Sequence, residues 1–317
     1  MHLLTQIRRK FITSFPIKFV IRKSKNIILP GFSGIPLFDV VRFFFIQIQK
    51  TSLNERAASI AFNLLVAIPP ACIFLFTLIP YLPIKEFLDQ LKELIRDIMP
   101  GKQNHDPIIN FIDDFSKTER GGLLSFGFLL ALYFSSNAMI GIMRSFNKMN
   151  YIGFSQRHAV HDRWVAIKLT LILFLIMLMS IIVLVSRETV LTWLGVEDPV
   201  VRTIILNVRW IVIILLFFLT ISFIYRYAPA VHKKWKLVNP GSILATFMMI
   251  VYTMGFSYYV ANFGNYNQLY GSIATILILM LLIFFNSLVL LIGFELNVSI
   301  SSLRKLADQR KNSVSDG

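Results

Sequence analysis

The sequence predicts an all-α polytopic membrane protein with six transmembrane helices and both termini in the cytoplasm. Hydrophobic residues make up 56% of the 317 positions, and the mean hydropathy is +0.66. Globular domains are nearer half apolar, with about a quarter of their residues charged. Six apolar runs approach the roughly 20 residues that a helix needs to cross a bilayer. Their lengths and the composition together indicate that these runs lie in a membrane.

The apolar runs define the predicted spans and the parts of the chain around them. The spans cover about 57–82, 121–143, 164–186, 208–228, 241–262 and 271–296. We therefore expect a basic cytoplasmic N-terminal segment (1–56), a six-helix transmembrane domain (57–300) and a polar cytoplasmic tail (301–317).

Lysines and arginines give the orientation. The N-terminal segment, the second and fourth connections and the tail together hold 22 of them, against 8 in the other three connections. Cytoplasmic connections carry the excess of Lys and Arg, which places both termini inside. The first connection (83–120) also carries eight acidic residues. The overall bias of Lys and Arg places this connection outside the cytoplasm although it holds six of them, because its acidic residues have little weight in this rule.

Two elements are expected outside the spans. The segment Pro36–Lys50, "PLFDVVRFFFIQIQK", has the length and aromatic content of an interfacial helix. In the outer loop (83–120), apolar residues recur at helical spacing on both sides of Pro100-Gly101, which predicts two short amphipathic helices. These helices either cap the bundle or form an outward recognition surface.

A polar cluster is expected at the cytoplasmic ends of the spans. Two asparagines extend it inward, because each lies seven residues from an arginine and shares its helix face. An unpaired charge there is costly, so Glu295 is expected to pair with an arginine. The cluster either fastens the bundle or binds an anion or headgroup, for which arginine is suited. Its members are Arg56, Asn63, Asn137, Arg144, Asn147, Arg226 and Glu295.

Two further features bear on function. Pro69-Pro70 lies near the middle of the first span and predicts a helix break, because each proline removes a backbone hydrogen bond. Such breaks line cavities or pack against protein. The uncharged hairpin "VANFGNYNQLYGSIAT" joins the last two spans on the outer face, as a structural lock or as a gate. Its candidate residues are Asn262, Asn265, Asn267, Tyr270 and Gly271.

Four blocks of the chain resemble a known family. They are "NERAASIAFNLLVAIPPACIFL", "ALYFSSNAMIGIMRSFNKMN", "YRYAPAVHKKWKLVNPGSILAT" and "YYVANFGNYNQLYGSIATILILMLLIFFNSLVLLIGFELN". In this order they resemble the blocks of the YihY/BrkB family of bacterial inner-membrane proteins, over roughly residues 36–300. The resemblance implies six spans and a multi-pass location in the bacterial inner membrane. The family has been labelled a virulence factor and, by misassignment, ribonuclease BN.

The residues favour two functions and disfavour enzymatic activity. No compact His/Asp cluster, nucleophile elbow or phosphate loop occurs in the sequence. We expect no cofactor and no metal. The formal net charge of +15 is interpreted as attraction to anionic membrane lipids and not to nucleic acid. The protein either transports or handles a lipid-like or small amphiphilic substrate, or serves as a non-transporting envelope-assembly scaffold; a ribonuclease is least expected.

Overall fold

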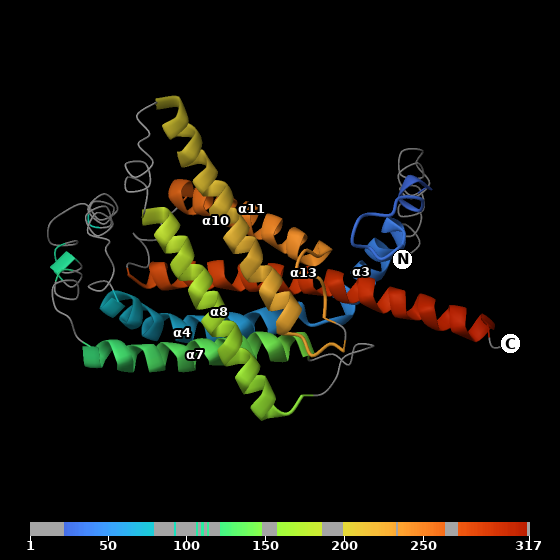
Figure 1. Ribbon diagram of the computed structural model, residues 1–317, viewed down its shortest axis with the longest axis horizontal. Coiled ribbons are helices and arrows are strands. Elements are labelled where there is room, and N and C mark those ends of the chain that lie inside the picture. Colours follow the sequence, from blue (N-terminus) through green and yellow to red (C-terminus); the bar gives the residue numbers. More distant parts are fainter. Residues whose placement is uncertain are drawn as a thin grey trace. The chain divides into compact units, whose positions relative to one another are not determined.

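The computed structural model forms helices over the predicted spans (Figure 1). It describes residues 22–78, 92, 106, 109–110, 113, 121–147, 157–185, 199–232, 234–263 and 272–315. Six of the helices in this part of the chain are long and apolar enough to cross a membrane. The helices are α3 (Leu37–Lys50), α4 (Leu53–Leu78), α7 (Gly121–Asn147), α8 (Ala159–Val185), α10 (Pro199–Tyr227), α11 (Pro240–Phe263) and α13 (Ser272–Ser315).

The chain divides into two compact units. The first unit comprises Met1–Ala58, Phe146–Ser155 and Pro229–Gly317, and the second comprises Ser59–Ser145 and Gln156–Ala228. The first unit therefore holds α3, α11, α13 and the start of α4. The second holds the rest of α4, α7 up to Ser145, α8 and α10, while the last two residues of α7 belong to the first unit.

In the first unit, α3 and α11 both pack on α13. The helix predicted at Pro36–Lys50 is present as α3. It contributes Val40 to a small apolar core that also contains Phe32, Leu296 and Ile300. These core positions of α13 are four residues apart, one helical turn, so they lie on the same face. The apolar contact holds α3 and the loop before it against the C-terminal half of α13.

In the second unit, aromatic side chains join α4, α7 and α8. The ring of Phe74 on α4 lies 5.4 Å from that of Phe128 and 5.2 Å from that of Phe174, between ring centroids. Tilted aromatic rings at such separations attract one another, and this attraction adds to the stabilisation that comes from burying their surface. Helices α8 and α10 also pack together. Small residues allow close contact elsewhere: a side chain at Gly141 of α7 would meet Asn63 of α4 at 2.9 Å.

Helix α4 corrects the expectation of a break at Pro69-Pro70. It stays helical from Leu53 to Leu78, with both prolines inside it. Each proline removes one backbone hydrogen bond and its ring crowds the carbonyl of the preceding turn, but its fixed φ is compatible with a helix. In an apolar environment the remaining backbone groups have no partners other than one another, which favours keeping the helix.

Helix α13 is longer than its predicted span. Its 44 residues extend about 66 Å at 1.5 Å per residue, roughly twice the thickness of a hydrocarbon core. The helix continues from the span through most of the expected polar tail and ends at Ser315. The hairpin residues from Gly264 to Gly271, most of the outer loop and the side chain of Asn262 lie outside the described residues.

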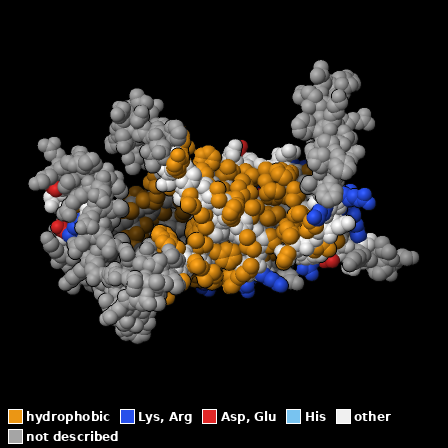
Figure 2. Space-filling view, turned by 90° about the horizontal axis from the view of Figure 1, so that it is seen from above, with side chains coloured by type: hydrophobic (Ala, Val, Ile, Leu, Met, Phe, Trp, Pro, Cys, Tyr) orange, Lys and Arg blue, Asp and Glu red, His pale blue; other side chains and the backbone are white. Residues whose placement is uncertain are grey.

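The helix surfaces expose large apolar side chains, as expected for contact with lipid. Phe62, Leu129 and Met254 are 67%, 63% and 69% exposed. Figure 2 shows hydrophobic side chains over much of the described surface in view. A soluble protein rarely exposes such extensive apolar surface, so the exposed side chains agree with the composition.

Candidate functional site: a buried polar network on α13

The network begins with the capped start of α11. Asn239 precedes the helix, and its Oδ1 accepts a hydrogen bond from the backbone N–H of Ser242 at 2.8 Å. The Ser242 hydroxyl in turn accepts from the backbone N–H of Asn239 at 3.3 Å. Asparagine is a strong N-cap residue, and Pro240 occupies the first helical position, where no N–H is needed. The tetrapeptide "NPGS" thus determines where α11 begins.

Asn297 of α13 completes this cap from another helix. Its Oδ1 accepts from the backbone N–H of Gly241 at 2.9 Å, and its Nδ2 donates to Asn239 Oδ1 at 2.6 Å. The first N–H groups of a helix have no partner within it, and lipid offers none. One amide from α13 therefore satisfies a backbone donor and fixes the capping side chain at the same time.

The approach of α11 to α13 requires a glycine at position 241. A Cβ there would lie 2.2 Å from the backbone oxygen of Gly293 and 2.5 Å from Nδ2 of Asn297. Both atoms belong to α13, and the first is backbone that cannot rotate away. Small residues at helix contacts in membranes let backbones come this close.

A buried ion pair lies two residues before Asn297. Arg56 Nη1 donates to Glu295 Oε1 at 2.7 Å, and the two side chains are 2% and 0% exposed. The expected pairing of Glu295 with an arginine is therefore present, and the arginine is Arg56. Nε and Nη2 of Arg56 are buried and make no hydrogen bond within the described part of the chain. The guanidinium thus has further donors beyond those that Glu295 uses.

Aromatic rings surround the same segment of α13. Phe294 stacks on Phe146 with 4.0 Å between ring centroids and 4° between ring planes. Trp235 lies 5.7 Å from Phe294, and its Nε1 donates to Ser301 Oγ at 3.0 Å. These rings exclude water from this part of α13 and thereby strengthen the electrostatic interactions of its polar groups.

Asn147 takes part in the first unit at the end of α7. Its Oδ1 accepts from the backbone N–H of Ala230 at 3.0 Å. This bond ties the end of α7 to the segment that leads into α11. Asn147 was among the residues expected in the cluster, and its side chain serves a backbone group there.

The second unit contains the other predicted residues. Asn137 Oδ1 accepts a hydrogen bond from Arg163 of α8 at 2.5 Å, and the Arg163 guanidinium lies 4.9 Å from the Tyr133 ring centroid. Asn63 Nδ2 donates to the backbone oxygen of Ser59, within its own helix. An amide and an aromatic face thus stabilise Arg163, by hydrogen bonding and by cation–π attraction.

The remaining arginines of the predicted cluster have different surroundings. Arg144 is exposed. The Arg226 guanidinium lies 5.6 Å from the Tyr227 ring centroid, and its Nε is buried without a hydrogen bond inside the described residues.

Just before α8, burial lowers the pKa of Arg157, while the Asp162 charge acts in the opposite direction. Arg157 also donates to the backbone oxygen of Ala228 at 3.3 Å.

The side chains of the network can bind a polar or anionic group, and they hold the helices together. Among the described residues, no group of three or more His, Cys, Asp and Glu side chains is placed to hold a metal ion. The network offers guanidinium, amide and hydroxyl groups next to one carboxylate. Such groups bind anions and satisfy helix ends.

Replacing Asn297 with alanine is expected to destabilise the protein by about 1–3 kcal/mol. The buried N–H of Gly241 loses its acceptor, and an unmade buried hydrogen bond carries this penalty. Thermal unfolding of the purified protein in detergent measures the change. Asn286→Ala is the matched control, because the hydrogen bond that Asn286 donates to Leu282 among the described residues stays within α13. Equal losses in the two variants would contradict the role given to Asn297.

The comparisons with known proteins agree with this architecture. The family model described as "Virulence factor BrkB" matches residues 44–316. A ribonuclease-like protein, YfkH, of Bacillus subtilis (strain 168) is 30% identical over 261 residues, covering 81% of this chain and 93% of that protein. A UPF0761 membrane protein of Stenotrophomonas maltophilia (strain K279a) is 23% identical over 272 residues.

The extent of these matches differs between relatives. The Stenotrophomonas alignment covers 83% of this chain but 61% of that protein. A UPF0761 membrane protein of Tolumonas auensis is 35% identical over 80 residues, 25% of this chain and 26% of that protein. No solved structure matches the chain. Since the family model covers most of the sequence and all six apolar helices, the chain belongs to the virulence factor BrkB family of membrane proteins.

Proposed function

We propose that the protein binds a lipid-like or small amphiphilic substrate within the bacterial inner membrane and moves it across, or exposes it at, that membrane. The observation that carries the proposal is the buried Arg56–Glu295 pair in apolar helices. Ionisable residues inside membrane segments are rare, and they commonly mark the path of a substrate or ion.

The hydrogen-bond donors of Arg56 support a substrate that carries an anionic group. Glu295 accepts from Nη1, whereas Nε and Nη2 make no hydrogen bond within the described residues. A guanidinium presents its donors in a planar fork that suits phosphate and carboxylate. An amphiphile with such a headgroup would place its charge at Arg56 and its apolar part among the helices.

The proposal is tested by lipid translocation in vesicles. The full chain is reconstituted with fluorescently labelled phosphatidylglycerol or phosphatidylethanolamine, and a membrane-impermeant quencher reports lipid reaching the outer leaflet. We expect faster translocation than in protein-free vesicles. The variant Arg56→Gln/Glu295→Gln should lower this rate roughly tenfold or more, because hydrogen bonds to charged groups contribute about 1.5–3 kcal/mol.

The neutral pair keeps a hydrogen bond between side chains of similar size, so the variant is expected to remain folded. Lys236→Gln/Asp308→Asn is the matched control, since it also removes one exposed charge of each sign from the first unit. If no lipid moves, or if the glutamine pair moves lipid at the normal rate, the transport proposal fails. The ribonuclease-like name of the Bacillus relative is not carried over, because the network offers no nuclease chemistry.

A further inference from the structure

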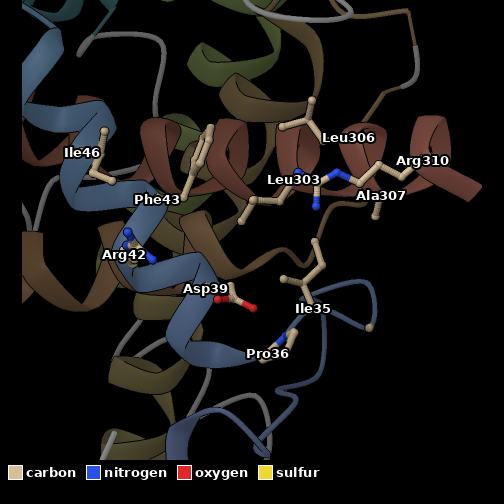
Figure 3. A pocket seen from close by; sticks show the side chains of 11 residues that line it. Ile35, Pro36, Asp39, Arg42, Phe43, Ile46, Leu303, Leu306, Ala307 and Arg310 are labelled. Carbon is tan, nitrogen blue, oxygen red and sulfur yellow. The ribbon is translucent and has the colours of Figure 1, made fainter.

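A crevice of about 530 Å³ lies between α3 and the C-terminal part of α13 (Figure 3). Positions 303, 306, 307 and 310 of α13 line it, and the spacing of three and four residues places them on one face. On the other side, positions 39, 42, 43 and 46 of α3 line it with the same spacing. The volume lies within the range of small-molecule sites. We call this the α3–α13 crevice.

The crevice combines an apolar lining with arginines from both helices. Phe43, Leu303 and Leu306 supply apolar surface, and Arg42 and Arg310 contribute a guanidinium from each side. The close-up shows the Arg310 side chain folded back along α13 toward Leu303 (Figure 3). Both arginines are exposed, so their charges are available to a ligand.

One carboxylate and one further arginine modify the charge. Asp39 of α3 also lines the crevice. Nearby, Arg304 Nη1 donates to the hydroxyl of Ser33 at 3.5 Å, in the loop before α3. Its Nε lies 4.0 Å from Asp308. The lining itself therefore has two positive groups and one negative group, which favours an anion.

The crevice is built on packed elements. Beside it, Phe32 is 6% exposed and Val40 is fully buried against α13, so the loop and α3 are held in place. Ile46 of α3 lines the crevice and is 42% exposed, and its neighbour Phe45 is 58% exposed. The apolar lining is thus continuous with the exposed apolar surface of an interfacial helix. An acyl chain could lie on this surface while a headgroup occupies the crevice.

We propose that the α3–α13 crevice binds the anionic headgroup of a phospholipid. The charge of the chain's own N-terminal segment argues against that segment as the occupant. Residues 1–21 carry Arg8, Arg9, Lys10 and Lys18 and no acidic residue, so the two arginines of the crevice repel them. An anionic lipid matches both the arginines and the apolar lining.

Lipid titration of the full-length protein in detergent tests the proposal. Native mass spectrometry counts bound phosphatidylglycerol, with phosphatidylcholine as the zwitterionic comparison. We expect preferential binding of phosphatidylglycerol, and Arg42→Gln and Arg310→Gln should each weaken it about fivefold. Asp39→Asn should instead strengthen it, since it removes the only acidic side chain of the lining.

Lys50→Gln and Lys236→Gln are the matched controls, because both lysines are exposed and neither lines the crevice. Equal weakening in controls and crevice variants, or equal binding of the two lipids, would overturn the proposal. Displacement of the lipid by millimolar inorganic phosphate would also overturn it, since the site would then recognise a free anion. The variant Ala307→Trp should fill the crevice and abolish lipid binding. Retained binding would show that the lipid lies elsewhere.

The inference does not depend on transport. It concerns equilibrium binding at α3 and the end of α13, whereas translocation is measured as a rate and tested at Arg56 and Glu295. Loss of translocation with intact lipid binding would reject only the proposed function. Loss of preferential binding with intact translocation would reject only the crevice.

Discussion

Replacing Arg56 with alanine is expected to lower the free energy of unfolding by about 3–5 kcal/mol. The variant leaves the carboxylate of Glu295, which is fully buried, without its guanidinium partner. Removing one member of a buried ion pair carries this penalty, because the remaining charge stays out of water without compensation. Thermal or denaturant unfolding of the purified protein in detergent measures the loss. Glu295→Ala should give a similar result.

An apolar replacement of the whole pair separates charge burial from packing. In Arg56→Met/Glu295→Leu both charges are absent and the volume is largely kept, so stability should return close to that of the original protein or exceed it. This variant should still fail to translocate lipid if the pair serves a substrate. Single variants that unfold at the same temperature as the original protein would show that the two side chains do not form this contact.

Gly241→Ala adds a single methyl group and is expected to destabilise the protein more than any other change of that size. The added methyl would lie 2.2 Å from the backbone oxygen of Gly293, a contact that only a separation of α11 from α13 can relieve. Overpacking costs about 1–3 kcal/mol or more where the neighbour cannot move. Separation would also stretch the hydrogen bonds of Asn297. Yield of folded protein and unfolding temperature report the effect.

Gly255→Ala is the matched control in the same helix. A Cβ at Gly255 meets no atom within 4 Å. Alanine is the better helix former by about 1 kcal/mol, so this variant should be neutral or slightly stabilised. If both alanine variants behaved alike, the close approach at Gly241 would be refuted.

The helical architecture could be predicted because lipid leaves few options. A run of about 20 apolar residues must satisfy its own backbone hydrogen bonds, so length and hydropathy were enough to find the helix of every span. The helix at Pro36–Lys50 was equally readable from its composition. The continuation of α13 to Ser315 was not, because a polar helix beyond the membrane depends on packing against α3 and on side-chain pairs, not on hydropathy. The break expected at Pro69-Pro70 is not found, because apolar surroundings favour a continuous helix.

The polar network was predicted in part. A buried Glu295 needs a cation, so a partner was expected. Three arginines were available, and the packing of the helices selects Arg56. Asn239 and Ser242 were overlooked, although "NPGS" carries the signal of a capped helix start. The docking of Asn297 on that cap could not be foreseen, since it joins residues 58 positions apart through the packing of two helices. Asn137 was placed with Arg144 by helical spacing alone, whereas its hydrogen bond comes from Arg163 on another helix.

The long sequence separation of Glu295 and Asn297 from their partners has a consequence for biogenesis. Arg56 is inserted 239 residues before its counter-ion, and the start of α11 precedes its completing amide by 58 residues. Until α13 has entered the membrane, Arg56 therefore lacks the carboxylate of Glu295. The start of α11 likewise lacks the amide of Asn297 that accepts from its backbone. Helix α13 then closes this polar network, and nascent chains that stop before it should be substrates for membrane quality control.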